Sequence, residues 1–142
     1  MPRRALVLVA LLAAGCGGGS GEGTVTQETL SPDQREAGDI ALRYVRAVAR
    51  GDWTAVCETR TRSEQREMSR LGGSCETAMQ AVFKGKPTDL FEKVRIGDVR
   101  VRGDVAGVDL VQPGQSEPVT TVAAVREGDR WRLEDVPDEK IP

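Results

Sequence analysis

The sequence predicts an α+β domain in which the helices come first and an antiparallel sheet of about four strands follows. From Ser31 to Phe83, apolar residues recur every three or four positions, which is typical of helices that bury one face. From Val94 onward, apolar and polar residues alternate, which is typical of strands with one buried face. Gly-Asp pairs separate the alternating runs and suit tight turns. Together these patterns predict helices packed on one face of a curved sheet.

The first helix is expected to begin after Ser31 and to end at Gly51. Ser31 is a good N-cap, Pro32 fits the first turn, and Gln34 completes a capping box. Gly38 lies inside the helix at a cost in stability, which indicates a close contact with another segment. The apolar stripe consists of Ala37, Ile40, Ala41, Tyr44, Val45 and Val48.

Three shorter helices are expected before the sheet. Asp52 caps a helix over residues 52–60, and Thr61 with Glu64 forms a second capping box. Glycines 72 and 73 end that third helix, and Ser74 caps a fourth. The apolar face of the fourth helix comprises Cys75, Ala78, Met79, Val82 and Phe83.

The alternating pattern predicts four strands. The first covers residues 93–102, and its phase changes at Gly97-Asp98, which indicates a β-bulge. Gly103-Asp104 turns the chain into the second strand. The third and fourth are expected over residues 119–125 and 130–136, and residues 137–142 are expected to form a frayed C-terminal tail.

Near the start of the chain, Arg3 and Arg4 precede an unbroken apolar run over residues 5–14, which is followed by Gly15 and Cys16. This order resembles a bacterial lipoprotein signal. The resemblance implies that residues 1–15 are removed and that Cys16 receives diacylglycerol and fatty acid such as palmitate. The domain would then be exported and held at the cell membrane, facing outward.

Three alternatives to a lipoprotein signal fit these residues less well. Ten apolar residues are too few for a transmembrane anchor, which needs about 20. An ordinary secretory signal would leave Cys16 as an extra cysteine in an exported protein. A twin-arginine signal would fit Arg3 and Arg4, but its polar flanking residues are missing.

Residues 16–30 begin as a Gly/Ser run and then become polar. Such a segment buries too little apolar surface to offset its ordering entropy, so we expect a flexible linker. The folded domain is then expected over residues 31–136.

The composition excludes several classes of function. The chain has 20 basic and 22 acidic residues, so binding to nucleic acid is not expected. It has no histidine, which excludes His-based catalysis and Zn–His sites. No catalytic residue, metal ligand or cofactor is predicted.

Cys57 and Cys75 remain as a pair once Cys16 is assigned to the lipid. An even pair in an exported protein predicts a disulfide. The alternatives are a redox pair or a metal site, but the sequence has no CxxC motif and no histidine.

Two segments, ALRYVRAVARGDWTAVCE and VREGDRWRLEDV, resemble the NTF2-like (cystatin-like) superfamily. Members show a long helix, a Gly-Asp-aromatic step, a short helix and a closing strand that carries Trp. The resemblance covers residues 31–136, although no early strand pair is seen between the helices. It implies a cone-shaped cavity between helices and sheet. The aromatic residues would line this cavity or fill it: Tyr44, Trp53, Phe83, Phe91 and Trp131.

A run of charged residues alternates in sign over residues 58–70. We expect it to be a solvated helical face with mixed ion pairs. A contact with an anionic headgroup or an envelope polymer is a second interpretation. The residues are Glu58, Arg60, Arg62, Glu64, Arg66, Glu67 and Arg70.

These observations predict a membrane-anchored envelope lipoprotein that acts as a non-enzymatic binding or interaction module. Its partners would be the membrane, through the lipid on Cys16, and an envelope protein or a small apolar ligand. The alternative is a small isomerase- or hydratase-like enzyme that uses an Asp in the cavity. Such an enzyme also needs an oxyanion-stabilising Tyr or protonated acid, and the only Tyr, Tyr44, lies on an apolar stripe.

Overall fold

The computed structural model describes residues 29–142. The predicted signal over residues 1–15, Cys16 and most of the predicted linker lie outside the described residues. Leu30, the last residue of the predicted linker, is buried and contributes to the core.

The described chain has the predicted α+β class, with four α-helices before a four-stranded antiparallel sheet. The helices are α1 (Pro32–Arg50), α2 (Trp53–Glu58), α3 (Arg62–Gly72) and α4 (Cys75–Phe83). The strands are β1 (Arg95–Arg102), β2 (Val105–Val111), β3 (Pro118–Glu127) and β4 (Arg130–Leu133), and they lie in the order β1-β2-β3-β4. Two 3-10 helices, η2 (Asp89–Lys93) and η3 (Asp138–Lys140), precede and follow the sheet. The sheet is open.

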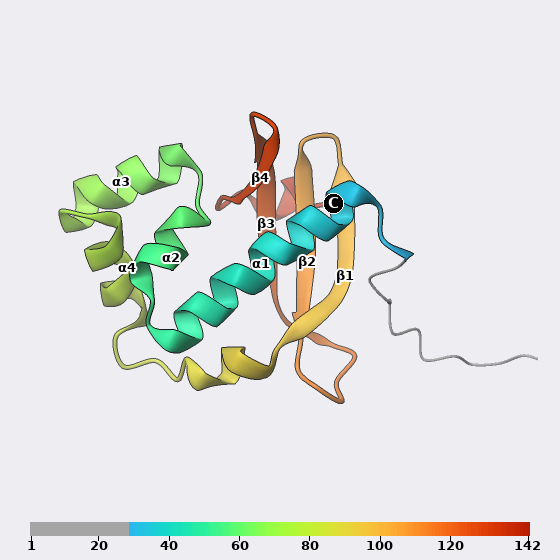
Figure 1. Cartoon of the computed structure of the whole chain (residues 1–142), viewed down its shortest axis with the longest axis horizontal. Helices are drawn as coiled ribbons and strands as arrows, with labels where there is room; N and C mark the ends of the chain where they lie inside the picture. Colours follow the sequence, from blue (N-terminus) through green and yellow to red (C-terminus); the bar gives the residue numbers. More distant parts are fainter. Residues whose placement is uncertain (1–28) are drawn as a thin grey trace, which may run out of the picture.

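The long helix α1 lies across one face of the sheet, while α2, α3 and α4 gather beyond its C-terminal end (Figure 1). Its predicted ends are confirmed: Ser31 and Gln34 form a complete capping box, and Gly51 ends the helix with φ of 66°. The close contact expected at Gly38 is also confirmed. A Cβ at this position would lie 2.6 Å from Cδ1 of Ile96.

Small and branched side chains fill the space between α1 and the sheet. Ala106, Val108 and Leu110 of β2 have no exposed surface, and neither has Ala124 of β3. A side chain without exposed surface has no water-sized space beside it, so the packing here is close. The opposing side chains of α1 are Ala37, Ala41, Val45 and Val48.

The strands follow the predicted pattern, with corrections at their ends. The bulge in β1 is confirmed, because the register shifts between Ile96 and Val99. The third strand is longer than predicted, since it spans Pro118–Glu127. The fourth ends at Leu133 rather than at residue 136. Beyond it, the Glu134 N–H still donates to Ala123 of β3, and the Asp135 N–H, on the opposite edge, donates to the Glu64 carboxylate. A side chain of α3 therefore holds the chain where it leaves the sheet.

The C-terminal tail is ordered, so the expectation of a frayed end is wrong. Nε of Arg100 donates to the main-chain oxygen of Pro142 at 2.6 Å. Ile141 packs over Gly107, where a Cβ would lie 2.6 Å from Cγ2 of the isoleucine. The missing side chain at residue 107 therefore makes room for the tail on the sheet face opposite α1. Over residues 29–142, no helix is both long and apolar enough to cross a membrane.

Candidate functional site: an aromatic recess between helices

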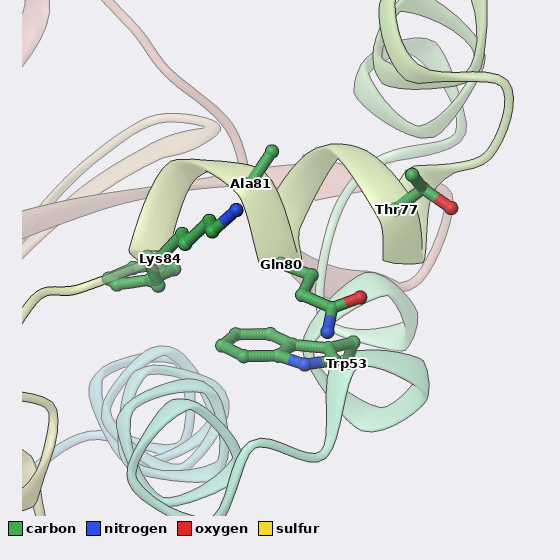
Figure 2. A pocket seen from close by; sticks show the side chains of 6 residues that line it. Trp53, Thr77, Gln80, Ala81 and Lys84 are labelled. Carbon is green, nitrogen blue, oxygen red and sulfur yellow. The ribbon is translucent and has the colours of Figure 1, made fainter.

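A recess of about 540 Å³ lies between α2 and α4 and is open to solvent (Figure 2). Trp53 forms one wall, and residues of α4 form the other. Its lining residues are Trp53, Thr77, Gln80, Ala81, Phe83 and Lys84. Most of the lining is apolar, with polar groups at the rim, as in many ligand sites.

The aromatic residues around the recess form a row. The rings of Trp53 and Phe83 are stacked, with centroids 5.8 Å apart and planes 16° apart. Phe91 of η2 meets Phe83 edge to face at 6.5 Å. Nζ of Lys86 lies 5.8 Å from the centre of the Phe83 ring. Both stacked rings remain half-buried, so an apolar group can still cover them.

The structure separates the five aromatic residues into different places. Trp53, Phe83 and Phe91 lie together at the recess. Trp131 is only 2% exposed, and the Arg126 guanidinium lies 4.7 Å from the centre of its ring. Tyr44 is also buried, beside Arg60. Of the five aromatic residues, Trp53 and Phe83 line the recess. The spacing of these residues in the sequence did not reveal that the recess lies at the surface.

The α4 face was predicted incorrectly at one position. Val82 is 51% exposed, whereas Cys75 and Met79 are buried. The last turn of α4 is partly open to solvent, although its last residue, Phe83, stacks on Trp53, the first residue of α2. This turn carries one wall of the recess.

A disulfide joins the two helices that form the recess. Cys57 of α2 bonds to Cys75 of α4, with their Cα atoms 6.1 Å apart, which confirms the predicted pair. Both cysteines are buried. Trp53 lies one turn before Cys57 on α2, and Phe83 lies about two turns after Cys75 on α4. The disulfide therefore ties together the two helices that carry the recess walls.

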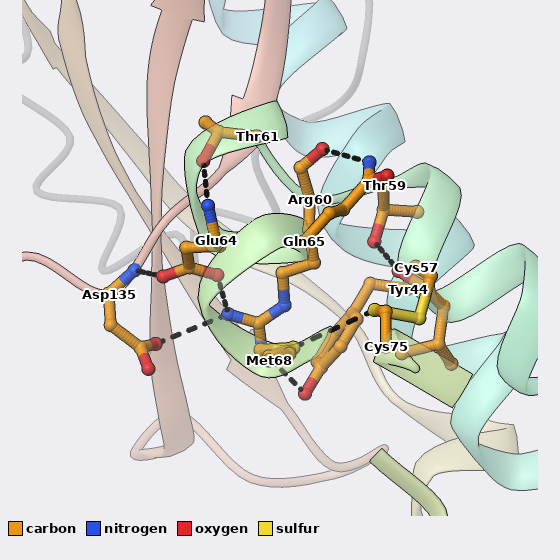
Figure 3. Close-up of polar contacts among 11 residues, drawn as sticks. Tyr44, Cys57, Thr59, Arg60, Thr61, Glu64, Gln65, Met68, Cys75 and Asp135 are labelled. Carbon is orange, nitrogen blue, oxygen red and sulfur yellow. Dashed lines mark hydrogen bonds and ion pairs between the residues drawn. A yellow bond between two sulfur atoms is a disulfide. The ribbon is translucent and has the colours of Figure 1, made fainter. Parts of the chain in front are cut away.

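A buried charged cluster lies next to the disulfide (Figure 3). Nη1 of Arg60 donates to Glu64 at 2.7 Å and to Asp135 at 3.3 Å, and Nη2 donates to the Tyr44 hydroxyl at 3.1 Å. Burial disfavours the charged guanidinium, but Tyr44, Glu64 and Asp135 outweigh that effect and hold the pKa of Arg60 above its usual range. Arg60 therefore keeps its charge, and the cluster anchors α3 to the end of the sheet.

This cluster corrects two expectations. Thr61 caps α3 as predicted, but Glu64 does not complete the capping box, because the Thr61 N–H donates to Leu133 instead. The mixed surface pairs expected over residues 58–70 are also wrong. The Arg60–Glu64 pair is buried, and within the described residues no ion pair of Arg62, Arg66 or Arg70 is formed.

A second polar network lies on the outer face of the sheet. Arg100 binds both carboxylate oxygens of Asp109, at 2.6 and 3.0 Å, and Thr121 donates to the same carboxylate at 2.6 Å. The hydrogen bonds from Arg100 hold the pKa of Asp109 below its usual range. This network connects β1, β2 and β3, and through Pro142 it also holds the tail.

In residues 29–142, no group of three or more His, Cys, Asp or Glu side chains is placed to hold a metal ion. Comparison with known proteins gave no matching family model and no matching curated sequence.

Proposed function

We propose that this chain is a cell-envelope lipoprotein, anchored through a lipid on Cys16, whose NTF2-like domain is a non-enzymatic binding module. The module takes an apolar or aromatic group, from an envelope protein or a small apolar ligand, into the aromatic recess between α2 and α4. The observation that carries the proposal is the recess itself, where the stacked rings of Trp53 and Phe83 face an open space of about 540 Å³.

The packing of the domain supports binding at the surface. The inner face of β2 has no exposed side-chain surface, so a ligand would find little room between α1 and these residues. At the recess, by contrast, covering a ring removes apolar surface from water at a gain of about 25 cal/mol per Å². None of the described lining residues is acidic, and Lys84 stands at the rim. This favours an apolar ligand that also carries an anionic group.

The lipid anchor is supported by the sequence of residues 3–16 and by the disulfide. Cys57–Cys75 is the kind of bond that persists outside the reducing cytosol, as export would require. Cys16→Ala should move the protein from the membrane fraction to the soluble fraction of cells. Continued retention in the membrane would contradict the anchor.

The alternative, an isomerase- or hydratase-like enzyme, requires an Asp in an internal cavity. Among the described residues, the buried polar side chains are Thr59, Arg60, Thr61 and Glu64, and Asp is not among them. We therefore prefer the binding module.

The recess can be tested with anilinonaphthalene sulfonate, a fluorescent probe with fused apolar rings and an anionic group. Trp53→Leu should weaken binding of the probe about tenfold, because it removes the stacked ring. Val119→Ala, a change at an exposed apolar residue of β3, is the control and should leave binding unchanged. Equal binding by both variants would contradict the proposal.

A further inference from the structure

We infer that three arginines on the outer face of α3 form a docking surface for a membrane rich in anionic lipids. Arg62, Arg66 and Arg70, here called the arginine stripe, are all exposed. The inference rests on the proposed function in one respect, because the lipid on Cys16 would bring the domain to a membrane. The arginine stripe lies on a different part of the domain from the recess.

The spacing of the stripe places its charges in one row. Residues four apart on a helix lie about 5–6 Å from each other, so the three side chains follow one another along α3. With Gln65 and Ser69 they line a shallow hollow of about 450 Å³. Both polar neighbours donate to main-chain oxygens, Gln65 to Arg60 at 3.0 Å and Ser69 to Gln65 at 2.8 Å. The guanidinium groups therefore dominate the charge of the hollow.

The stripe has no internal counter-charge in the part of the chain that the structure describes. No carboxylate lies within 4.0 Å of any of its guanidinium groups, although the protein has more acidic than basic residues. Glu64, between Arg62 and Arg66 in the sequence, is turned inward to Arg60 and Asp135. Among the described residues, Glu67 forms no ion pair with the stripe, and Glu127 accepts the main-chain N–H of Arg62 rather than its guanidinium. All three guanidinium groups can therefore bind an external anion.

The stripe also lowers the stability of its own helix. Like charges at i and i+4 destabilise a helix by a few tenths of a kcal/mol per pair, and Arg62 lies at the positive end of the helix dipole. Arg70 lies in the last turn of α3, as Arg50 does in α1, and a cation is favourable there. Helix stability therefore explains Arg70 but not Arg62 and Arg66.

The way in which α3 is attached leaves its outer face free. Its one fully buried residue is Glu64, and the disulfide holds the chain on both sides of the helix (Figure 3). The lipid proposed on Cys16 would hold this face near a bilayer, so the anionic surface within reach of the stripe is that of the membrane.

The lengths of the segments allow the lipid and the stripe to reach one membrane. The 19 residues of α1 span about 28 Å, and α3 lies beyond the C-terminal end of α1 (Figure 1). The 12 residues 17–28 separate Cys16 from the described part of the chain, and a segment of that length can span at most about 40 Å. The domain can therefore lie on its side, with α3 against the surface that holds the lipid.

The test measures binding of the full chain carrying Cys16→Ala to lipid vesicles by co-sedimentation. Vesicles of phosphatidylcholine alone report the background from the apolar residues 5–14, and vesicles that also contain phosphatidylglycerol report the anionic component. Replacing Arg62, Arg66 and Arg70 together by Gln should lower binding to the anionic vesicles about 100-fold, as expected for three cations near an anionic surface. The same change at Arg43, Arg46 and Arg50 of α1 is the matched control and should have a much smaller effect.

High salt should remove the difference in vesicle binding between the stripe variant and the parent, because the charges are exposed and screened.

An equal loss of vesicle binding in the stripe and control variants would overturn the inference. So would binding to soluble polyphosphate without binding to anionic vesicles, which would assign the stripe to a polymer. Far-UV circular dichroism checks the fold, and Arg66→Gln alone, with an expected loss of about fivefold, gives a second measurement. Neither result depends on probe binding at the recess or on the cell fractionation of Cys16→Ala.

Discussion

Arg60 and Glu64 form an ion pair inside the protein, with 2.7 Å between Nη1 and Oε2 and with both residues more than nine-tenths buried. The other oxygen of Glu64 accepts the main-chain N–H of Asp135, which lies just beyond β4. One carboxylate thus joins the start of α3 to the point where the chain leaves the sheet (Figure 3).

Replacing Glu64 by Gln should destabilise the protein by about 3 kcal/mol. The change leaves the Arg60 charge buried without its closest partner, and breaking a buried pair in this way is costly. Urea unfolding of the variant measures the loss. Glu67→Gln, at an exposed position of the same helix, should change stability by less than about 0.5 kcal/mol. Similar values for the two variants would show that the pair contributes little.

Reduction of the Cys57–Cys75 disulfide should lower the free energy of unfolding by about 3 kcal/mol, because the bond closes a loop of 18 residues in the unfolded chain. Unfolding of the Cys57→Ser, Cys75→Ser double variant measures the loss. Because the bond also ties α2 to α4, the double variant should bind the fluorescent probe more weakly under conditions where it is still folded. An unchanged affinity would mean that packing alone holds the recess walls.

The contribution of Asp109 to the free energy of unfolding should depend on pH. Its pKa is lowered in the folded protein by the hydrogen bonds from Arg100, so the stability that it contributes is present above its unfolded pKa of about 3.8 and is lost as pH falls through the lower folded value. Asp109→Asn should therefore cost about 1.5 kcal/mol from pH 7 down to pH 5, as for a hydrogen bond to a charged group. The difference from the parent should shrink below about pH 4. A difference that stays constant to pH 2 would contradict the role of the charge.

The fold could be predicted largely from local signals in the sequence. Capping residues such as Ser31, the glycine at residue 51 and the change of period near Val94 act over a few residues, and their predictions are confirmed. The errors concern contacts between distant segments. Glu64 of α3 holds the chain just beyond β4, and the tail packs into the space above Gly107. Neither contact can be seen in the local sequence pattern.

The candidate site was harder to predict for the same reason. The cysteine pair follows from counting, but the sequence does not reveal that Trp53 and Phe83 stack at one end of the α2–α4 pair and stay half-buried. The spacing of Thr61 and Glu64 predicted a capping box, in which the Glu64 carboxylate would accept the N–H of Thr61. In the structure this carboxylate turns to the buried Arg60 instead.

The central claim, that the domain binds apolar groups at the recess, can be tested by nuclear magnetic resonance of the two tryptophan side chains. Trp53 lines the recess, whereas Trp131 is 2% exposed and serves as an internal control. Titration with anilinonaphthalene sulfonate should shift the indole N–H resonance of Trp53 in a saturable way and leave that of Trp131 unchanged. A resonance of Trp53 that does not move, or equal shifts at both indoles, would contradict the account.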